Sequence, residues 1–306
     1  MQAAGYRDIW TRSPDGLRLH ARLYGELGTR HLPVVCLPGL ARSAVDFHHL
    51  ATSLALDGRA VLAVDYRGRG LSDHDPDPTH YTVAVETADL LALLAEITIT
   101  EAVVVGTSRG GLIGMGLAAQ KPELVRGLVL NDIGPVIELS GLLRIKSYIG
   151  KLPATHDLAE GAAILRSVFA AQFPDLGEEA WLAWAEATWE ERDGALALGY
   201  DPALAATLEA LDAETQVPDL WPLFEALAAI PLLVIRGALS DLLSAETLTG
   251  MAERNPNLQT ITVARQGHAP LLQSPDLVRQ VGDFVRRVDR STEFSRAPGP
   301  NPPVQP

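Results

Sequence analysis

Cysteine is almost absent from this chain of 306 residues, which contains only Cys36. An intramolecular disulfide is therefore excluded, and the apolar neighbours Val35 and Leu37 favour a small buried core side chain over a reactive thiol. No group of histidines and cysteines has the spacing of a metal site. We therefore expect no disulfide and no metal, and a fold that depends on its hydrophobic core.

Positive charge and long apolar runs are also scarce. Lysine and arginine number 25 against 38 aspartates and glutamates, which gives a formal net charge of −13 without any basic stripe. This balance argues against a nucleic acid or an anionic membrane as a partner. No uninterrupted apolar stretch is long enough to span a bilayer, and residues 1–12 lack the features of a signal peptide. We expect a cytoplasmic protein.

Short, continuous apolar runs recur through the chain, and helical patterns separate them. Continuous apolarity predicts central parallel strands that are covered on both faces. The predicted strands are residues 34–37, 60–64, 102–105, 127–130 and 232–235, with 258–263 nearer a sheet edge. The predicted helices are residues 83–97, 112–119, 248–254 and 271–288. This alternation predicts a doubly wound, mostly parallel α/β sheet.

Three segments depart from the alternation. Residues 6–24 predict an antiparallel hairpin, because the turn sequence Ser13-Pro14-Asp15-Gly16 separates two extended runs. From 135 to about 222 no strand is evident, and helix-like segments predict a lid over the carboxyl ends of the strands. The last residues are rich in Pro, Ser and Gly and predict a disordered tail. The predicted division is a first core part at 1–134, a helical lid at 135–225, a second core part at 226–290 and the tail at 291–306.

The pentapeptide Gly106-Thr107-Ser108-Arg109-Gly110 lies between a predicted strand and a predicted helix. In this context G-x-S-x-G predicts a nucleophile elbow, a sharp turn that exposes a serine at the end of a strand. Glycine two residues before and after Ser108 lets strand and helix approach each other. Ser108 is the predicted nucleophile, although a tight strand-to-helix connection would explain the pentapeptide taken alone.

A serine nucleophile needs a histidine base and a carboxylate that orients the histidine. Of eight histidines, His268 alone directly follows a late predicted strand, ahead of the last helix. Asp241 follows the strand at 232–235, and the order Ser108, Asp241, His268 is that of this hydrolase layout. Asp132, which follows the strand at 127–130, is the alternative acid; otherwise it would shape the entrance to the lid. We expect Asp241 to orient His268.

An oxyanion that forms at Ser108 would need two N–H donors. The backbone N–H of Arg109 is one candidate, because it follows the nucleophile at the start of a helix. The second is the backbone N–H of Leu40, in the glycine-containing loop after the first apolar strand. A plain strand-to-helix turn is the alternative for that loop. The backbone N–H groups of Leu40 and Arg109 are therefore the predicted donors of an oxyanion hole.

Together these residues resemble the α/β-hydrolase superfamily, in its lid-bearing branch of small esterases, lactonases and carbon–carbon bond hydrolases. The resemblance extends over nearly the whole chain and implies the α/β-hydrolase fold. Its anchors are Leu37-Pro38-Gly39-Leu40, Asp65-Tyr66-Arg67-Gly68-Arg69-Gly70-Leu71-Ser72, Gly106–Gly110, Asp241 and Gly267-His268. A serine nucleophile argues against haloalkane dehalogenase or epoxide hydrolase chemistry, which uses aspartate.

Two positions depart from the family pattern. Pro38 stands where many members have a histidine before the glycine of the oxyanion loop. Arg109 stands where Met, Leu, Gln or Phe is common. We expect the Arg109 side chain to pair with a nearby acid such as Asp132, with contact to an anionic substrate as the alternative.

The resemblance and the residues together predict a cofactor-free serine hydrolase that acts on a small-molecule carboxylic ester through an acyl-enzyme. One alternative is a lactonase or a carbon–carbon bond hydrolase of ring-cleavage products with the same triad. The other is a non-catalytic ligand-binding protein on the same fold.

Overall fold

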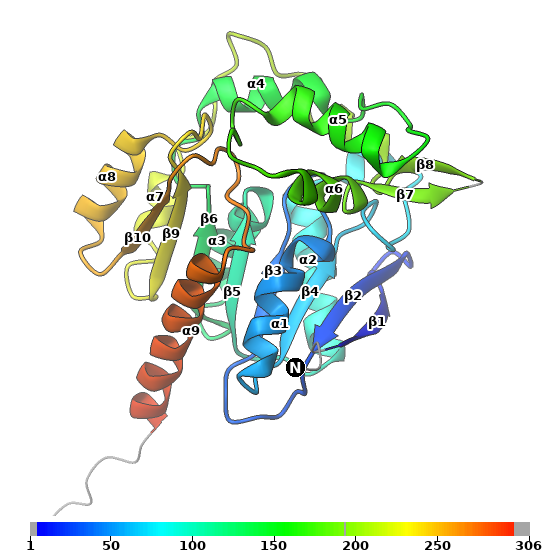
Figure 1. The fold of residues 1–306 in the computed structure, drawn as a ribbon. Coiled ribbons are helices and arrows are strands. Elements are labelled where there is room, and N and C mark those ends of the chain that lie inside the picture. The colour runs from blue at the N-terminus through cyan, green and yellow to red at the C-terminus, as the bar shows by residue number, and fades with distance from the viewer. Residues whose placement is uncertain (1–4, 193, 297–306) are drawn as a thin grey trace, which may run out of the picture.

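The structure is a computed structural model, and it describes residues 5–192 and 194–296, with side chains as far as Ser291. Within this part of the chain, an eight-stranded sheet has the strand order β1-β2-β4-β3-β5-β6-β9-β10 (Figure 1). The pairs β1–β2 and β2–β4 are antiparallel, and all other neighbours in the sheet are parallel. The predicted fold class, a mostly parallel α/β sheet with an N-terminal hairpin, is confirmed.

Strands and helices alternate along most of the described chain. The strands are β1 (Tyr6–Arg12), β2 (Arg18–Tyr24), β3 (Val34–Leu37), β4 (Val61–Asp65), β5 (Ala102–Thr107), β6 (Val125–Asn131), β7 (Trp189–Arg192), β8 (Ala195–Leu198), β9 (Leu232–Gly237) and β10 (Gln259–Val263). The α-helices are α1 (His48–Leu56), α2 (Val83–Glu96), α3 (Arg109–Gln120), α4 (Leu139–Tyr148), α5 (Leu158–Phe169), α6 (Glu178–Glu186), α7 (Trp221–Glu225), α8 (Ala245–Arg254) and α9 (Pro275–Arg296). Short 3₁₀ helices are η1 (Ala44–Phe47), η2 (Pro78–His80) and η3 (Pro202–Leu208).

Two helical layers cover the sheet, as a doubly wound fold requires. Side chains of α1 and α9 pack with alternate strand residues on one face, and those of α2, α3 and α8 contribute to the core on the other. Helix α3 can lie close to the sheet because Gly114 has no side chain. A Cβ at this position would be only 2.8 Å from the Leu128 side chain. Strand β5 lies inside the sheet, between β3 and β6, and α3 starts just after its carboxyl end. Among the described residues, no helix combines the length and apolarity needed to cross a membrane.

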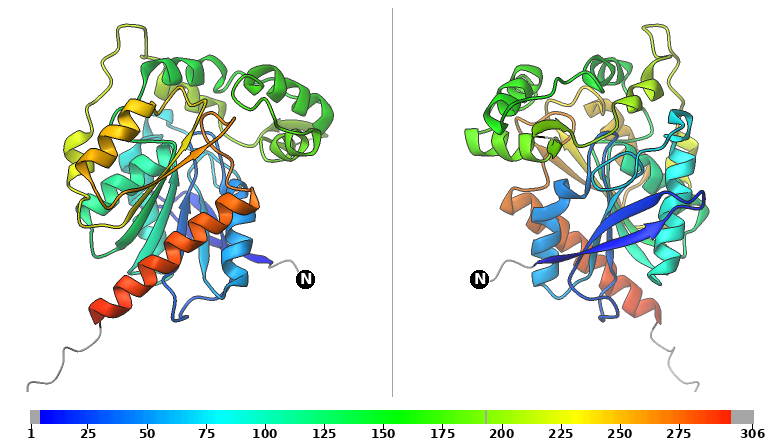
Figure 2. Two further views of the ribbon diagram at one scale, coloured as in Figure 1. Left: turned by 60° about the vertical axis from the view of Figure 1, so that its left-hand side comes forward. Right: turned by 90° about the vertical axis from the view of Figure 1, so that its right-hand side faces the viewer.

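The segment between β6 and β9 forms a cap at the carboxyl ends of the strands (Figure 2). It contains α4, α5, α6, η3 and α7, but also the antiparallel pair of β7 and β8. The prediction of a purely helical lid is therefore wrong for this pair. The sequence Asp193-Gly194 between the two strands is a typical two-residue hairpin signal, and the abundance of Ala, Leu and Glu around it obscured that signal.

The C-terminal helix is longer than its composition indicated. Helix α9 continues to Arg296, so the prediction of disorder from residue 291 is wrong for 291–296. Buried Val281, Val285 and Val288 anchor the helix against the sheet, and each further residue then adds one hydrogen bond at little cost. The remainder of the predicted tail, 297–306, lies outside the described residues.

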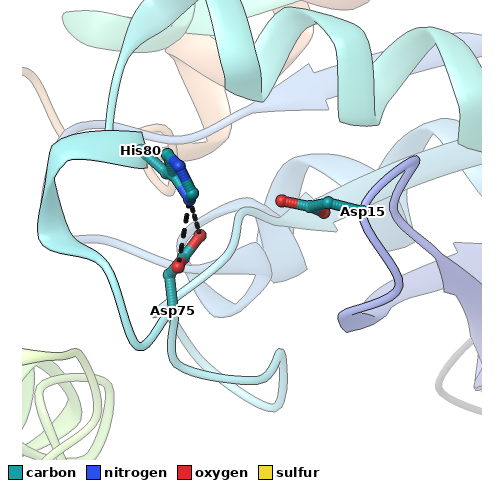
Figure 3. Close-up of side chains that lie close together, drawn as sticks. All are labelled: Asp15, Asp75 and His80. Carbon is teal, nitrogen blue, oxygen red and sulfur yellow. Dashed lines mark hydrogen bonds and ion pairs between the residues drawn. The ribbon is translucent and has the colours of Figure 1, made fainter.

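Arg67 is buried beside the N-terminal hairpin and ties three segments together. Its guanidinium donates to Asp15 in the β1–β2 turn, to Asp75 in the loop after β4 and to Asp89 on α2, at 2.5–3.1 Å. Asp15, Asp75 and His80 point toward one another (Figure 3) and could by distance hold a metal ion. The cation among these carboxylates is Arg67, so the cluster is an ion-pair network of the fold.

Substitution Arg67→Met is expected to lower the free energy of unfolding by about 3–5 kcal/mol, because removing one partner leaves buried charges uncompensated. Asp75 and Asp89 are both buried. Burial raises the pKa of Asp89 even though Arg67 favours its charged form. Urea unfolding followed by circular dichroism measures the loss.

The control for this variant is Arg286→Met, which removes an arginine from two carboxylates, Asp57 and Asp283, that are about half exposed. Water can solvate those carboxylates, so the unfolding midpoint is expected to move far less. Equal shifts of the urea midpoint in the two variants would show that the buried network stabilises the fold no more than a surface ion pair does.

Candidate active site

Ser108 occupies a sharp turn between β5 and α3. Its backbone has φ +51° and ψ −115°, a conformation that non-glycine residues rarely adopt. A Cβ at Gly106 would lie 2.4 Å from the Gly110 carbonyl oxygen, and one at Gly110 would lie 2.1 Å from that of Leu37. Both positions therefore require glycine, as the G-x-S-x-G pattern indicated. The Ser108 N–H donates to Asn131 O at 3.0 Å, which ties the turn to the neighbouring strand β6.

A continuous hydrogen-bonded chain joins Ser108, His268 and Asp132. Ser108 Oγ lies 2.9 Å from His268 Nε2, and His268 Nδ1 lies 2.8 Å from Asp132 Oδ2. His268 comes from the loop after β10, and Asp132 from the residue directly after β6. The Asp132 side chain is fully buried and that of His268 nearly so. The structure thus brings together the serine and histidine that the sequence singled out, with the alternative acid.

Asp132 is held by the last residue of β9 and by the loop that follows this strand. Its Oδ1 accepts from the backbone N–H of Gly237 at 2.8 Å, and its Oδ2 also accepts from Ser240 Oγ at 2.6 Å. With His268, three donors converge on the two carboxylate oxygens. Three hydrogen bonds on its two oxygens fix the direction of this buried carboxylate.

The placement of Asp241 contradicts the expectation that it orients His268. Asp241 forms a two-pronged ion pair with Arg144 of the cap helix α4, at 2.5 and 2.9 Å. Burial would raise the pKa of Asp241, but the hydrogen bond and charge of Arg144 outweigh it and lower the pKa. The turn after β9 directs Ser240 inward to Asp132, and the next side chain then points to the cap. Asp241 therefore lies at a contact between cap and core.

Arg109 pairs with an acid, as expected, but the acid is Glu86 on α2 and not Asp132. Arg109 Nε donates to Glu86 Oε2 at 2.5 Å, and Nη2 donates to Tyr81 O at 2.7 Å. The side chain is thus engaged in the protein interior. As the first residue of α3, Arg109 has a backbone N–H outside the hydrogen-bond pattern of its helix.

Leu40 lies in the loop after β3 and lines the same cavity as Ser108. Its carbonyl oxygen accepts from Arg69 Nε at 2.7 Å. The participation of the Leu40 and Arg109 N–H groups in an oxyanion hole stays a prediction.

A cavity of about 660 Å³ opens above Ser108 between core and cap. Ser108 and His268 lie in its lining, and the cap contributes Tyr148, Leu165, Phe169 and Trp184, among others. Trp184 stacks on Phe169 with 4.9 Å between ring centroids. Its lining also includes Tyr6 and the exposed residue His49, so the cavity reaches the surface of the protein. This space suits a small organic molecule with an apolar part under the cap.

Sequence reasoning missed several side chains that support these residues. Asn131, the last residue of β6, donates to Thr107 Oγ1 at 3.1 Å and to Pro270 O at 3.0 Å, and so links the elbow to the histidine loop. A polar residue that ends an otherwise apolar strand was an available signal. Arg144, Ser240 and Glu86 had no such signal, because their partners are distant in the sequence.

Comparisons with known proteins agree on one superfamily. The family model described as alpha/beta hydrolase fold matches residues 33–145. A 3-hydroxybutyrate-oligomer hydrolase of Cupriavidus necator is 37% identical over 274 residues, which are 86% of this chain and 91% of that protein. A 2-(acetamidomethylene)succinate hydrolase of Mesorhizobium japonicum is 28% identical over 81% of this chain and 85% of its own. The crystal structure of an alpha/beta hydrolase from Novosphingobium aromaticivorans superimposes with a TM-score of 0.86 at 42% identity, over 93% of this chain and 99% of that one.

Proposed function

Since this chain belongs to the α/β-hydrolase superfamily and is a hydrolase, we propose that it cleaves carboxylic esters through a serine acyl-enzyme. In this proposal Ser108 is the nucleophile, His268 the base and Asp132 the acid of the triad. The observation that carries the proposal is the unbroken chain of hydrogen bonds from Ser108 through His268 to Asp132, with Ser108 and His268 in the lining of a cavity.

The geometry supports the following mechanism. Ser108 Oγ attacks the ester carbonyl while His268 Nε2 takes its proton. Asp132 keeps the other ring nitrogen protonated and stabilises the imidazolium that forms. The N–H groups of Leu40 and Arg109 bind the oxyanion. His268 then protonates the leaving alcohol and activates a water molecule, which releases the acid. No step requires a cofactor.

For the substrate, we propose esters of short hydroxy acids, including linear oligomers. The name of the Cupriavidus necator relative specifies a 3-hydroxybutyrate oligomer as that protein's substrate. In this chain, the cavity beside Ser108 is lined by aromatic side chains of the cap and by Tyr6 and His49 at the surface. We propose that a linear substrate occupies this space with its ester at Ser108 and further units along the remaining lining.

The test combines a covalent probe with a substrate series. A fluorophosphonate should modify the protein once, on the tryptic peptide that contains Ser108, as read by mass spectrometry. The purified protein is then incubated with a p-nitrophenyl ester, a linear 3-hydroxybutyrate trimer, a lactone and a ring-cleavage diketone. We expect hydrolysis of the two linear esters. Modification at another residue, or turnover of the diketone alone, would contradict the proposal.

A further inference from the structure

Three charged side chains lie buried behind the serine turn and contact no reacting group. Arg69, in the loop after β4, and Glu86, on α2, are completely buried, and the Arg109 side chain is 14% exposed. Glu86 Oε2 accepts from Arg109 Nε at 2.5 Å. Glu86 Oε1 lies 2.7 Å from Arg69 Nη1 without hydrogen-bond alignment, so this contact is ionic. Burial of such charges is costly, and their position next to the site requires an explanation.

Each of the two arginines is connected to one of the two segments that carry the predicted oxyanion donors. Arg69 Nε donates to Leu40 O at 2.7 Å and thereby fixes the loop after β3. Arg109 supplies its own backbone N–H, and its side chain is bound by Glu86 and by Tyr81 O. Glu86 therefore connects the Leu40 loop to the start of α3 through one carboxylate.

We propose that Arg69, Glu86 and Arg109 are positioning residues that set the spacing of the Leu40 and Arg109 N–H groups around the oxyanion. This inference rests on the proposed serine esterase function. It also accounts for both departures from the family pattern. Arg109 follows the nucleophile because its side chain reaches Glu86, and the loop with Pro38 is braced by Arg69.

The loop that contains Gly39 and Leu40 needs a contact from outside to hold its conformation, because its own packing does not restrict the backbone. A Cβ at Gly39 would meet nothing closer than 3.5 Å, so crowding does not restrict the backbone there. Glycine has more conformational freedom than any other residue. The bond from Arg69 to Leu40 O limits that freedom on the other side of Leu40. An oxyanion hole is effective only if its donors are already oriented before the charge develops.

Glu86 keeps the two arginines together. Burial lowers the pKa of Arg69, and the charge of Arg109 lowers it further, whereas Glu86 opposes both effects. Without the Glu86 charge, two guanidinium groups would repel each other in the interior. The network carries one net positive charge, which also favours a negative oxyanion at the adjacent site.

The experiment compares the variants Glu86→Gln, Arg69→Met and Arg109→Met on a p-nitrophenyl ester. Loss of one oxyanion donor typically lowers kcat by about 10²–10³-fold. Since these residues position the donors, we expect kcat to fall by about 10²-fold with KM little changed. The affinity for a boronic acid, which places a negative oxygen in the hole, should fall in parallel with kcat, while the affinity for the product alcohol, which carries no charge, should not.

The chain offers a matched control in Arg59. It is also a buried arginine, donates to Leu32 O at 2.5 Å just before β3, and pairs with Asp289, but it lies at the amino ends of the strands. Arg59→Met should lower the urea midpoint and leave kcat and boronate affinity unchanged. Arg69→Met should lower kcat and boronate affinity whether or not its stability changes.

Two results would overturn the inference. One is an unchanged kcat in Glu86→Gln and Arg109→Met. The other is a kcat loss that follows the fraction of folded protein equally in Arg69→Met and Arg59→Met. Ser108→Ala separates this failure from failure of the proposed function. If Ser108→Ala is inactive while Arg109→Met is fully active, the esterase mechanism stands and only the positioning role is refuted. An active Ser108→Ala would refute both.

Discussion

Substitution Ser108→Ala is expected to lower kcat for a p-nitrophenyl ester by about 10⁶-fold, the scale seen when a serine nucleophile is removed. The reason is geometric. His268 Nε2 lies 2.9 Å from Ser108 Oγ, and no other hydroxyl lies within hydrogen-bond distance of that nitrogen in the described residues. Without Oγ, the cavity can still bind an ester and polarise its carbonyl. No acyl-enzyme can form, and only slow attack by water remains.

The same variant should fold normally. Ser108 Oγ bonds only to His268 among the described residues, and the turn itself is held by the Ser108 backbone and by glycines at 106 and 110. Alanine has the same Cβ as serine and tolerates the turn equally. Circular dichroism and the urea midpoint should therefore match the parent protein. Turnover near the parent rate in a folded Ser108→Ala protein would eliminate Ser108 as the nucleophile.

The serine and the histidine could be located from the sequence because their signals are local. The turn at Ser108 demands glycine at fixed distances, and that demand is written into five consecutive residues. His268 lies in the loop after β10, the last strand of the sheet. Since parallel strands end at the same edge, residues just after β5 and β10 share one side of the molecule. The fold followed from similar evidence, because short continuous apolar runs are typical of strands that are covered on both faces.

The choice between two acids could not be made in that way. Asp132 and Asp241 both follow strands that lie between Ser108 and His268 in the sheet. Both aspartates lie in loops at the carboxyl ends of strands, so only the direction of each side chain decides which one reaches His268. That direction depends on Arg144, which lies 97 residues before Asp241 in a cap helix. Contacts of this range have no periodic or local signal in a single sequence.

The buried network behind the site was hidden for a related reason. Glu86 lies on a helix whose apolar positions predict one buried face, and a glutamate there is ordinarily solvent-exposed. Its burial follows from two arginines that are distant from it in the sequence, Arg69 in the loop after β4 and Arg109 at the start of α3. Composition and spacing in the sequence do not distinguish a charged side chain that is buried in an ion pair from one that is exposed to solvent.

A comparison of Asp132→Asn with Asp241→Asn tests the acid directly. Asp132→Asn is expected to lower kcat by about 10⁴-fold, as replacement of a triad aspartate by asparagine does elsewhere. Three donors converge on Asp132, from His268, Gly237 and Ser240. Asparagine offers one acceptor oxygen and an NH₂ group, so it cannot accept from all three. If the NH₂ faces His268, the imidazole must carry its proton on Nε2, where it cannot accept the Ser108 proton.

Asp241→Asn is the matched control, because it makes the same chemical change in the rival loop. It weakens the ion pair with Arg144, a contact between cap and core whose side chains are 22% and 29% exposed. We expect kcat to change by less than about threefold, since a change below about 0.7 kcal/mol is typical for a partly exposed pair. KM is expected to rise more than kcat falls, because the cap lines the cavity. The steady-state constants of both variants decide the matter: a larger kcat loss in Asp241→Asn would return the role of acid to Asp241. That result would also require the cap to move, so that Asp241 loses its contact with Arg144 and contacts His268 instead.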